Sequence, residues 1–256
     1  AHLDAPLAGD AIYGDTSQGS VLSGLYRATE VFSPQRFDLA ESQYGLQAEK
    51  QTYVPRPIVV DTTLAGLSIN IAVRDAVGDG FELMVDANQQ WDRPTAQRMC
   101  RALEAFNLVW IEEPLDAYDH EGHAALAQQF DTPIATGEML TSPGEHWDLI
   151  RHRAADYIMP DGPRVGGITP FLKVAGLAHQ AGLMLAPHFA MELHVHLAAA
   201  YPTEPWVEHF EWLEPLFNER LEIANGRILV PTRPGLGLTL SDQARAWTRG
   251  QAEFTA

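Results

Sequence analysis

Short apolar runs and longer amphipathic segments alternate along most of the chain. From about residue 58 the apolar runs are IVV (58–60), FELMV (81–85), LVWI (108–111), PIAT (133–136), DYIM (156–159), LMLA (183–186) and WVEHF (206–210). Segments with helical periodicity follow most of them, and three carry the start signal of a capping residue with a proline close behind: Asp92 with Pro94, Ser142 with Pro143, and Thr169 with Pro170. Gly182 is a stop signal for the third. Short strands that alternate with helices indicate parallel βαβ units.

Seven such strands over residues 58–210 predict an α/β fold, a (β/α)7β TIM-like barrel whose eighth strand lies upstream or closes the ring. A doubly wound open sheet is the alternative, and it is disfavoured because no glycine-rich phosphate loop follows any of the strands. Residues 58–256 are interpreted as the barrel domain, with a C-terminal tail that holds a strand, RILV, and a helix, SDQARAWTRG. Residues 1–57 lack this rhythm and stay an unassigned N-terminal segment, in which YRATEVF (26–32) is the best strand candidate.

A polar residue ends most of the apolar runs. These residues are Asp86, Glu112, Glu138, Asp161 and His188, and the last run carries Glu208. Successive steps along the first five are 26, 26, 23 and 27 residues, which is about one strand, one loop and one helix each. In a βα barrel this spacing places the side chains at the C-terminal rim, where such enzymes hold their active sites.

The first three of these acids predict a metal site. Asp86, Glu112 and Glu138 would converge at the rim, and three converging carboxylates require a hard divalent cation, for which Mg²⁺ is the first choice. Glu112 is followed directly by Glu113, and since two adjacent carboxylates repel, a positive group is expected nearby. Glu113 and Asp116 are interpreted as supporting or solvated residues, not ligands.

The histidines support a different chemistry. His188 lies one βα unit after Asp161, and a carboxylate that fixes the imidazole tautomer makes the histidine a candidate general base. His194 and His196 look like a metal pair in the sequence HVH. Residues two apart on a helix do not share a face, however, so these two are interpreted as packing or surface residues.

Composition narrows the class of protein. The chain has 256 residues, 46% of them hydrophobic and 20% charged, which is typical of a globular domain. A formal net charge of −17 argues against nucleic acid as a partner, and without an apolar run of membrane length or a signal sequence no membrane span or secretion is expected. The single Cys100 fits a reducing compartment, so a cytoplasmic location is predicted. Cys100 and the tryptophans Trp110, Trp206 and Trp212 are expected in the core.

Six motifs resemble one enzyme family: VDANQQW, WIEEPLD, TGEML, PDGPRVGGITPFLK, LAPHFAMELHVHLAAAYP and EHFEW. They are similar to the mandelate racemase subgroup of the enolase superfamily, and most of all to galactarate/talarate-type acid-sugar dehydratases, from about residue 69 to 248. The resemblance implies a Mg²⁺-dependent lyase, a homo-oligomer that takes a small sugar acid. Such an enzyme abstracts the proton alpha to a carboxylate to give a metal-stabilised enediolate, which loses the beta hydroxyl to form a 2-keto acid.

The same resemblance assigns roles to residues. It implies that Asp86, Glu112 and Glu138 bind Mg²⁺, and that Asp161 and His188 form the dyad that exchanges the proton. Glu208 stands where the family places an acid that hydrogen-bonds the substrate carboxylate.

Two features depart from the family. The family carries a Lys-x-Lys motif on the second barrel strand, whereas this chain has only Lys50 and Lys173, and counting back from Asp86 puts Pro55–Arg56–Pro57 there. The family's N-terminal α+β capping domain is absent or incompletely represented in residues 1–68. A racemase or epimerase of the same superfamily and a non-catalytic metal-binding relative therefore stay open as alternatives, and the sequence does not specify which sugar diacid is used.

Overall fold

The computed structural model describes residues 58–61, 73–248 and 250. The chain forms two compact units, the first reaching Gly137 and including Gly144–Ile158, the second made of Glu138–Pro143 and the residues from Met159 onward. The predicted strand at 26–32 and the stretch 55–57 lie outside the described residues. The proposed domain boundary after residue 57 therefore stays a prediction.

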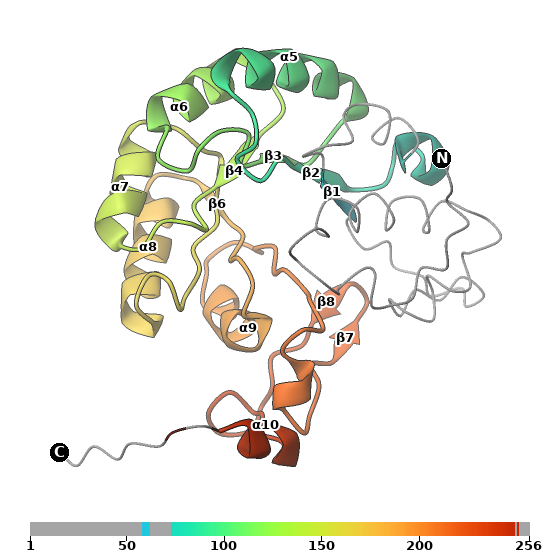
Figure 1. Cartoon of the computed structure of the whole chain (residues 1–256), viewed down its shortest axis with the longest axis vertical. Coiled ribbons are helices and arrows are strands. Elements are labelled where there is room, and N and C mark those ends of the chain that lie inside the picture. The colour runs from blue at the N-terminus through green and yellow to red at the C-terminus, as the bar shows by residue number, and fades with distance from the viewer. Residues whose placement is uncertain (1–57, 62–72, 249, 251–256) are drawn as a thin grey trace. The chain divides into compact units, whose positions relative to one another are not determined.

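Parallel strands in chain order build the first unit. They are β1 (Ile58–Asp61), β2 (Leu83–Asp86), β3 (Ile111–Glu112), β4 (Ile134–Thr136) and β5 (Tyr157–Ile158). Each pairs in parallel with the next. The connections hold α5 (Arg93–Leu103), the 3-10 turn η1 (Glu104–Phe106), α6 (His120–Gln129) and α7 (Pro143–Arg151), and α5 and α6 lie side by side next to the strands (Figure 1). This is the predicted βαβ pattern.

The predicted cap is present at α5, and α7 begins at Pro143 directly after Ser142, whereas the start of α8 (Ile168–Gln180) differs from the prediction. Asp92 accepts a hydrogen bond from the Thr95 N–H at 2.8 Å and so caps α5, with Pro94 in its first turn. Helix α8 is capped by Gly167, not by the predicted Thr169, because the preceding turn has φ of 96° at Gly166 and 106° at Gly167. Only glycine adopts these angles without strain, so the two glycines determine the residue at which α8 begins. Gly182, at φ 72°, ends it as predicted.

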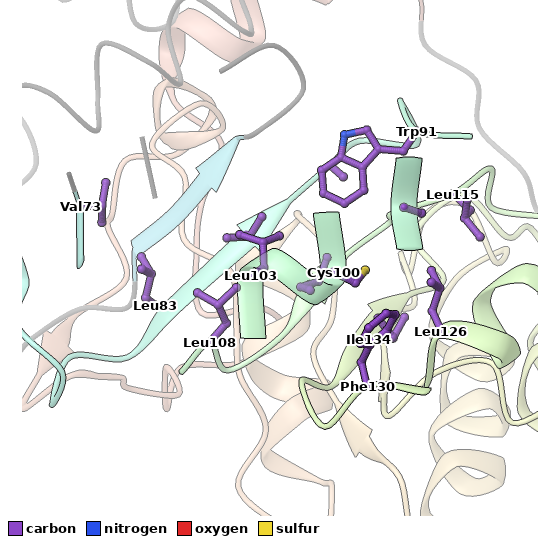
Figure 2. Close-up of a cluster of buried hydrophobic side chains, with 14 residues drawn as sticks. Val73, Leu83, Trp91, Cys100, Leu103, Leu108, Leu115, Leu126, Phe130 and Ile134 are labelled. Atoms are coloured by element: carbon purple, nitrogen blue, oxygen red, sulfur yellow. The ribbon is translucent and has the colours of Figure 1, made fainter. Parts of the chain in front are cut away.

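The core of the first unit lies between the strands and the helices α5 and α6 (Figure 2). Successive residues of β2, Leu83 to Val85, are all buried, which is typical of a parallel strand covered on both faces. Cys100 and Trp110 are buried as predicted, and burial raises the pKa of the Cys100 thiol to about 12. That thiol is therefore a packing residue.

The second unit is helix-rich. Besides α8 it holds β6 (Met184–Leu185), α9 (Met191–Ala199), the 3-10 turn η2 (Glu214–Leu216), the antiparallel pair β7 (Ile223–Ala224) and β8 (Arg227–Ile228), and α10 (Asp242–Trp247). Its core cluster consists of Val165, Phe171, Ala175, Leu185, Leu197 and Tyr201. Strand β8 and helix α10, which Ser241 caps, confirm the two elements predicted for the tail.

Two predictions for the last apolar run and its neighbours are wrong. WVEHF (206–210) is not a strand, and its Phe210 N–H donates to the Met191 Sδ at 3.0 Å instead of to a neighbouring strand. Trp212 is 51% exposed and stacks on Phe210, so it is not a core residue, and Trp206 is half-buried.

Within the part of the chain that the structure describes, no helix combines the length and the apolar character needed to cross a membrane.

Candidate active site

Two of the predicted metal ligands end neighbouring strands of the first unit. Asp86 is the last residue of β2 and Glu112 the last of β3, and their Cα positions are partners in the parallel register. Neighbouring strands are about 4.8 Å apart, so the two residues stand side by side at the carboxyl edge of the sheet. On the other side of Asp86 the register partner is Asp61, the last residue of β1.

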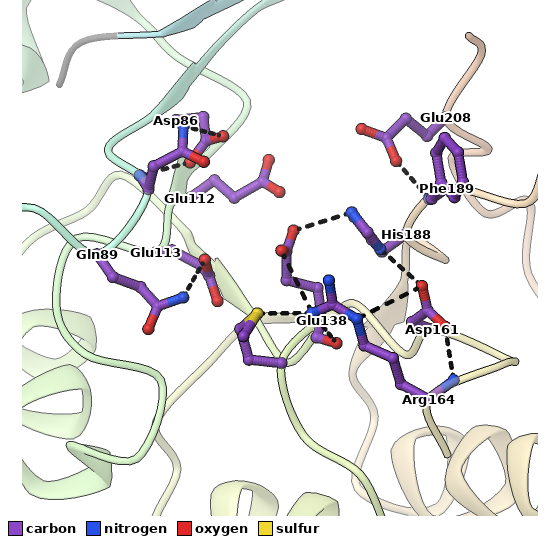
Figure 3. A network of polar contacts seen from close by, with 12 residues as sticks. Asp86, Gln89, Glu112, Glu113, Glu138, Asp161, Arg164, His188, Phe189 and Glu208 are labelled. Carbon is purple, nitrogen blue, oxygen red and sulfur yellow. Dashed lines mark hydrogen bonds and ion pairs between the residues drawn. The ribbon is translucent and has the colours of Figure 1, made fainter. Parts of the chain in front are cut away.

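Neutral N–H groups donate hydrogen bonds to these acids (Figure 3). Asp86 accepts from the backbone and the side-chain amide of Asn88, both at 2.8 Å. The Trp110 indole donates to Glu112 at 3.1 Å, and the Gln89 amide donates to the buried Glu113 at 2.8 Å. The positive group expected beside Glu112 and Glu113 stays a prediction, whereas the supporting position of Glu113 agrees with its interpretation.

The loops that follow β2 and β3 hold backbone in the left-handed region. Asn88 has a φ of 46°, Gln89 of 61° and Glu113 of 37°. Such angles cost up to about 1–2 kcal/mol for a residue with a side chain. They persist here because the Gln89 N–H donates to the Glu113 carbonyl at 2.8 Å. Strained backbone of this kind is frequent at functional sites, and here it lies beside the predicted ligands Asp86 and Glu112.

In the second unit the predicted pairing of Asp161 with His188 is present. The His188 Nδ1 lies 3.0 Å from the Asp161 Oδ2, and Asp161 also accepts from the Arg164 backbone N–H at 2.7 Å (Figure 3). Because a carboxylate can only accept, Nδ1 carries the proton and donates it. The other ring nitrogen, Nε2, is then unprotonated in the neutral ring and can act as a base.

The surroundings set the proton affinities of this pair. Burial by itself would lower the pKa of His188, but the hydrogen bond to Asp161 and the negative charge of Glu138 outweigh it, and the pKa is raised above its ordinary value. Burial would likewise raise the pKa of Asp161, yet the hydrogen bonds from His188 and Arg164 lower it overall. Asp161 is thus held as a carboxylate and His188 is made more basic.

Glu138 and Arg164 complete this group. The Glu138 Oε2 lies 3.3 Å from the His188 Nε2, and its other carboxylate oxygen is 3.8 Å from the Arg164 Nη1. The Arg164 Nη1 also donates to the Glu138 carbonyl at 3.1 Å, and the Nε lies 4.0 Å from Asp161. Sequence reasoning gave Arg164 no role. The sequence feature that could have identified it is an arginine three residues after Asp161, since basic residues are few in this chain, 17 against 34 acidic ones.

Glu208 lies beside the dyad. Its carboxyl accepts a hydrogen bond from the backbone N–H of Phe189, the residue after His188. Burial raises the pKa of Glu208, against the opposing effects of the His188 charge and the Phe189 hydrogen bond. The Phe189 ring lies 6.0 Å from that of Phe210 and 5.8 Å from that of Trp212, so aromatic rings border this position.

The three predicted metal ligands come from both units. Among the described residues no group of three His, Cys, Asp or Glu side chains is placed as a metal ion would require. Asp86 and Glu112 belong to the first unit and Glu138 to the second, so the triad stays a prediction. The interpretation of HVH is correct: His194 is fully buried, whereas His196 is half-buried with its Nε2 3.1 Å from the Leu236 carbonyl.

Comparison with known proteins places the chain among enolase relatives. Residues 58–244 match the family described as "Enolase C-terminal domain-like". The chain is 67% identical over 183 residues to the L-talarate/galactarate dehydratase of Salmonella typhimurium, covering 72% of this chain and 46% of that protein. It is 34% identical over 180 residues to the arabinonate dehydratase of Saccharolobus solfataricus, covering 67% and 48%. The chain thus spans about half the length of these relatives.

A solved structure agrees. The L-talarate dehydratase of Polaromonas sp. JS666, crystallised with Mg and L-glucarate, is 70% identical with a TM-score of 0.78, over 85% of this chain and 60% of that one. The similarity confirms the predicted fold class, because the domain shared by this family is a (β/α)7β barrel.

Proposed function

The chain belongs to the enolase C-terminal domain-like family, and on that premise we propose that it acts as a Mg²⁺-dependent acid-sugar dehydratase. The observation that carries the proposal is the hydrogen-bonded pair of Asp161 and His188, with Glu208 beside it. An oriented imidazole with a raised pKa is what removal of a weakly acidic carbon-bound proton requires. The name of the 67% identical relative supports talarate or galactarate as the substrate class.

The donor chemistry fits the metal. Asp86, Glu112 and Glu138 offer only carboxylate oxygens, the ligands that Mg²⁺ prefers, and the strand register sets the first two side by side. These three residues would hold the ion. When bound, Mg²⁺ would supply positive charge to the substrate carboxylate, on which negative charge accumulates as the neighbouring carbon is deprotonated.

His188 performs the proton transfer in this proposal. Its Nε2 takes the proton from the carbon alpha to the carboxylate, and the electron pair of the broken C–H bond moves into the carboxylate to give an enediolate. Asp161 stabilises the imidazolium that results. The returning electron pair then expels the beta hydroxyl, which leaves as water after protonation by the imidazolium. The enol that remains tautomerises to the 2-keto acid.

Glu208 would bind the substrate carboxylate. Two carboxylates repel unless one of them is protonated. Burial raises the pKa of Glu208, which favours its protonated form. A neutral Glu208 carboxyl can donate a hydrogen bond to the substrate. The hydrogen bond from the Phe189 N–H fixes its position next to His188.

The missing Lys-x-Lys motif favours dehydration over epimerisation. The chain has only Lys50 and Lys173, and Pro55–Arg56–Pro57 stands in the sequence where the family carries the second base. Inversion at the alpha carbon needs an acid/base group on both faces of the substrate, whereas removal of water needs the histidine face alone. We therefore expect proton exchange from the His188 face without inversion.

Turnover of galactarate and L-talarate tests the function. We expect the full chain to form a 2-keto acid from at least one of them with Mg²⁺ present and to stop when a chelator removes it. His188→Asn should abolish the product, and the control Asp116→Asn should not, because Asp116 is exposed and accepts only a local bond from the Tyr118 N–H in the described structure. Turnover in chelator, or full activity of His188→Asn, would refute the proposal.

We further propose a cytoplasmic homo-oligomer. Its single, buried cysteine supports a reducing compartment. Exposed apolar side chains such as Trp147, Leu172 and Trp247 support contacts between copies. Light scattering of the purified chain tests the assembly, and a monomeric mass at micromolar concentration would contradict it.

A further inference from the structure

Two consecutive residues after His188 are in the left-handed region. Phe189 has a φ of 54° and Ala190 of 35°, an arrangement that costs up to about 1–2 kcal/mol per residue. This turn leads from the segment after β6 that carries His188 into α9. Something must hold it, because a relaxed turn would move the imidazole away from Asp161.

Side chains hold both backbone polar groups of Phe189. Its N–H donates to the Glu208 carboxyl, and its carbonyl accepts from the Nδ1 of His194 at 2.6 Å. The backbone N–H of His194 also donates to the Ala190 carbonyl at 2.9 Å. His194, on α9, therefore hydrogen-bonds to both residues of the strained turn.

The other nitrogen of His194 reaches the opposite side of the dyad. Its Nε2 accepts a hydrogen bond at 2.9 Å from the N–H of Gly162, the residue that follows Asp161. A β-carbon on Gly162 would lie 2.8 Å from this Nε2, so any larger residue there would displace the ring. One buried imidazole thus connects the residue after Asp161 to the residue after His188.

The two partners fix the state of the ring. A backbone N–H can only donate and a carbonyl can only accept, so Nε2 must be unprotonated and Nδ1 must carry hydrogen. Burial lowers the pKa of His194, which favours this neutral form, and its ring stacks on Phe171 of the core at 5.4 Å between centroids. His194 is therefore a rigid spacer anchored in the core of the second unit.

From this geometry we propose that His194 is a positioning residue, a neutral imidazole that bridges Gly162 and Phe189 and so keeps Asp161 and His188 at hydrogen-bonding distance. It touches no substrate and transfers no proton. The proposal rests on the proposed function of the dyad, since the purpose of the bridge is to orient that pair.

Three variants test the bridge in the full chain with Mg²⁺. His194→Phe keeps the flat ring but removes both hydrogen bonds, and kcat for alpha-proton exchange should fall about 100-fold, the effect of a small misplacement. Mg²⁺ affinity should change less than about twofold, because none of the three carboxylates that would hold the ion is bonded to the bridge. His194→Gln offers one acceptor and one donor and should recover most of kcat. Gly162→Ala, which pushes the ring from the other side, should reproduce the loss.

His196→Phe is the matched control. It removes a histidine from the same helix whose Nε2 meets the Leu236 carbonyl, away from the dyad, and should leave kcat unchanged. A folded His194→Phe variant with wild-type kcat would overturn the proposal. So would equal losses in His194→Phe and His194→Gln, because rescue by an amide distinguishes the two hydrogen bonds from packing alone.

A measurement without substrate separates this inference from the proposed function. Nitrogen-15 NMR of the histidine rings, with His194 assigned through His194→Gln, should show Nδ1 protonated and Nε2 bare at neutral pH. A doubly protonated ring, or one protonated at Nε2, overturns the bridge whether or not any diacid is turned over. If the ring is as expected but the wild-type chain has no activity, the proposed function fails and the bridge remains as structure only.

Discussion

The predicted metal ligands of the first unit and the acids around the dyad in the second unit have different hydrogen-bond donors. In the first, neutral N–H groups of Asn88 and Trp110 donate to Asp86 and Glu112. In the second, cationic or titratable groups bond to the acids, His188 to Asp161 and Arg164 to both Asp161 and Glu138. A neutral donor orients a carboxylate without adding charge, whereas a basic partner adds positive charge and has its own pKa raised by the carboxylate. Under the proposed function, Asp86 and Glu112 would belong to a metal-binding half of the site and the dyad to a proton-transfer half, with Glu138 belonging to both.

The largest effect is expected from substitution of a proposed metal ligand in the first unit. Asp86→Asn removes a negative oxygen ligand, so we expect Mg²⁺ binding measured by calorimetry to be lost and turnover to be abolished. Asp116→Asn is the control, because Asp116 is also an acid but lies exposed in the loop after β3. Unchanged Mg²⁺ affinity in Asp86→Asn would show that the register pair of Asp86 and Glu112 is not a metal site.

The next largest effect is expected from substitutions in the dyad, which should stop proton transfer and leave metal binding unchanged. His188→Asn removes the base, and alpha-proton exchange should become undetectable. Asp161→Asn keeps the shape but supplies no charge for the imidazolium, and exchange should fall about 100-fold or more. Calorimetry should show nearly normal Mg²⁺ binding in Asp161→Asn. If Asp161→Asn exchanged protons at the wild-type rate, the separation into two halves would be wrong.

The sequence predicted the helices and strands better than the contacts between their side chains. Strand ends at Asp86 and Glu112 were visible because a charged residue stops an apolar run, and that signal is local. The contacts around the dyad were not visible, because Arg164 reaches Glu138, 26 residues away, and His194 reaches Gly162, 32 residues away, only after the chain has folded. The error at WVEHF has the same origin: its composition suits a strand, but its Phe210 N–H bonds to the side chain of the distant Met191.

A smaller expected effect concerns the pH dependence of the unfolding free energy, through a histidine of the first unit. His123, fully buried in α6, has its Nδ1 3.0 Å from the Asp119 carbonyl, and burial lowers its pKa to about 4 from an ordinary 6.5. Because the folded state holds this ring neutral, its contribution is complete above pH 6.5 and is lost as the pH falls toward 4. The difference of 2.5 pKa units corresponds to about 3 kcal/mol.

Denaturant unfolding at several pH values measures this loss. The unfolding free energy should decline below pH 6.5 in the wild-type chain and decline less in His123→Asn, which cannot take up a proton. His179→Asn is the control, since His179 is exposed on α8. Identical pH profiles for wild type and His123→Asn would show that the buried ring does not titrate as described.

The most direct measurement follows the alpha proton itself. The chain is incubated with Mg²⁺ and galactarate or L-talarate in D₂O, and NMR follows deuterium at the alpha carbons together with the product. A base on one face only, at His188, predicts deuterium in recovered substrate of unchanged configuration and formation of a 2-keto acid. Deuterium in both epimers would reveal a second base that the account lacks, and an absence of exchange in every diacid would contradict its central claim.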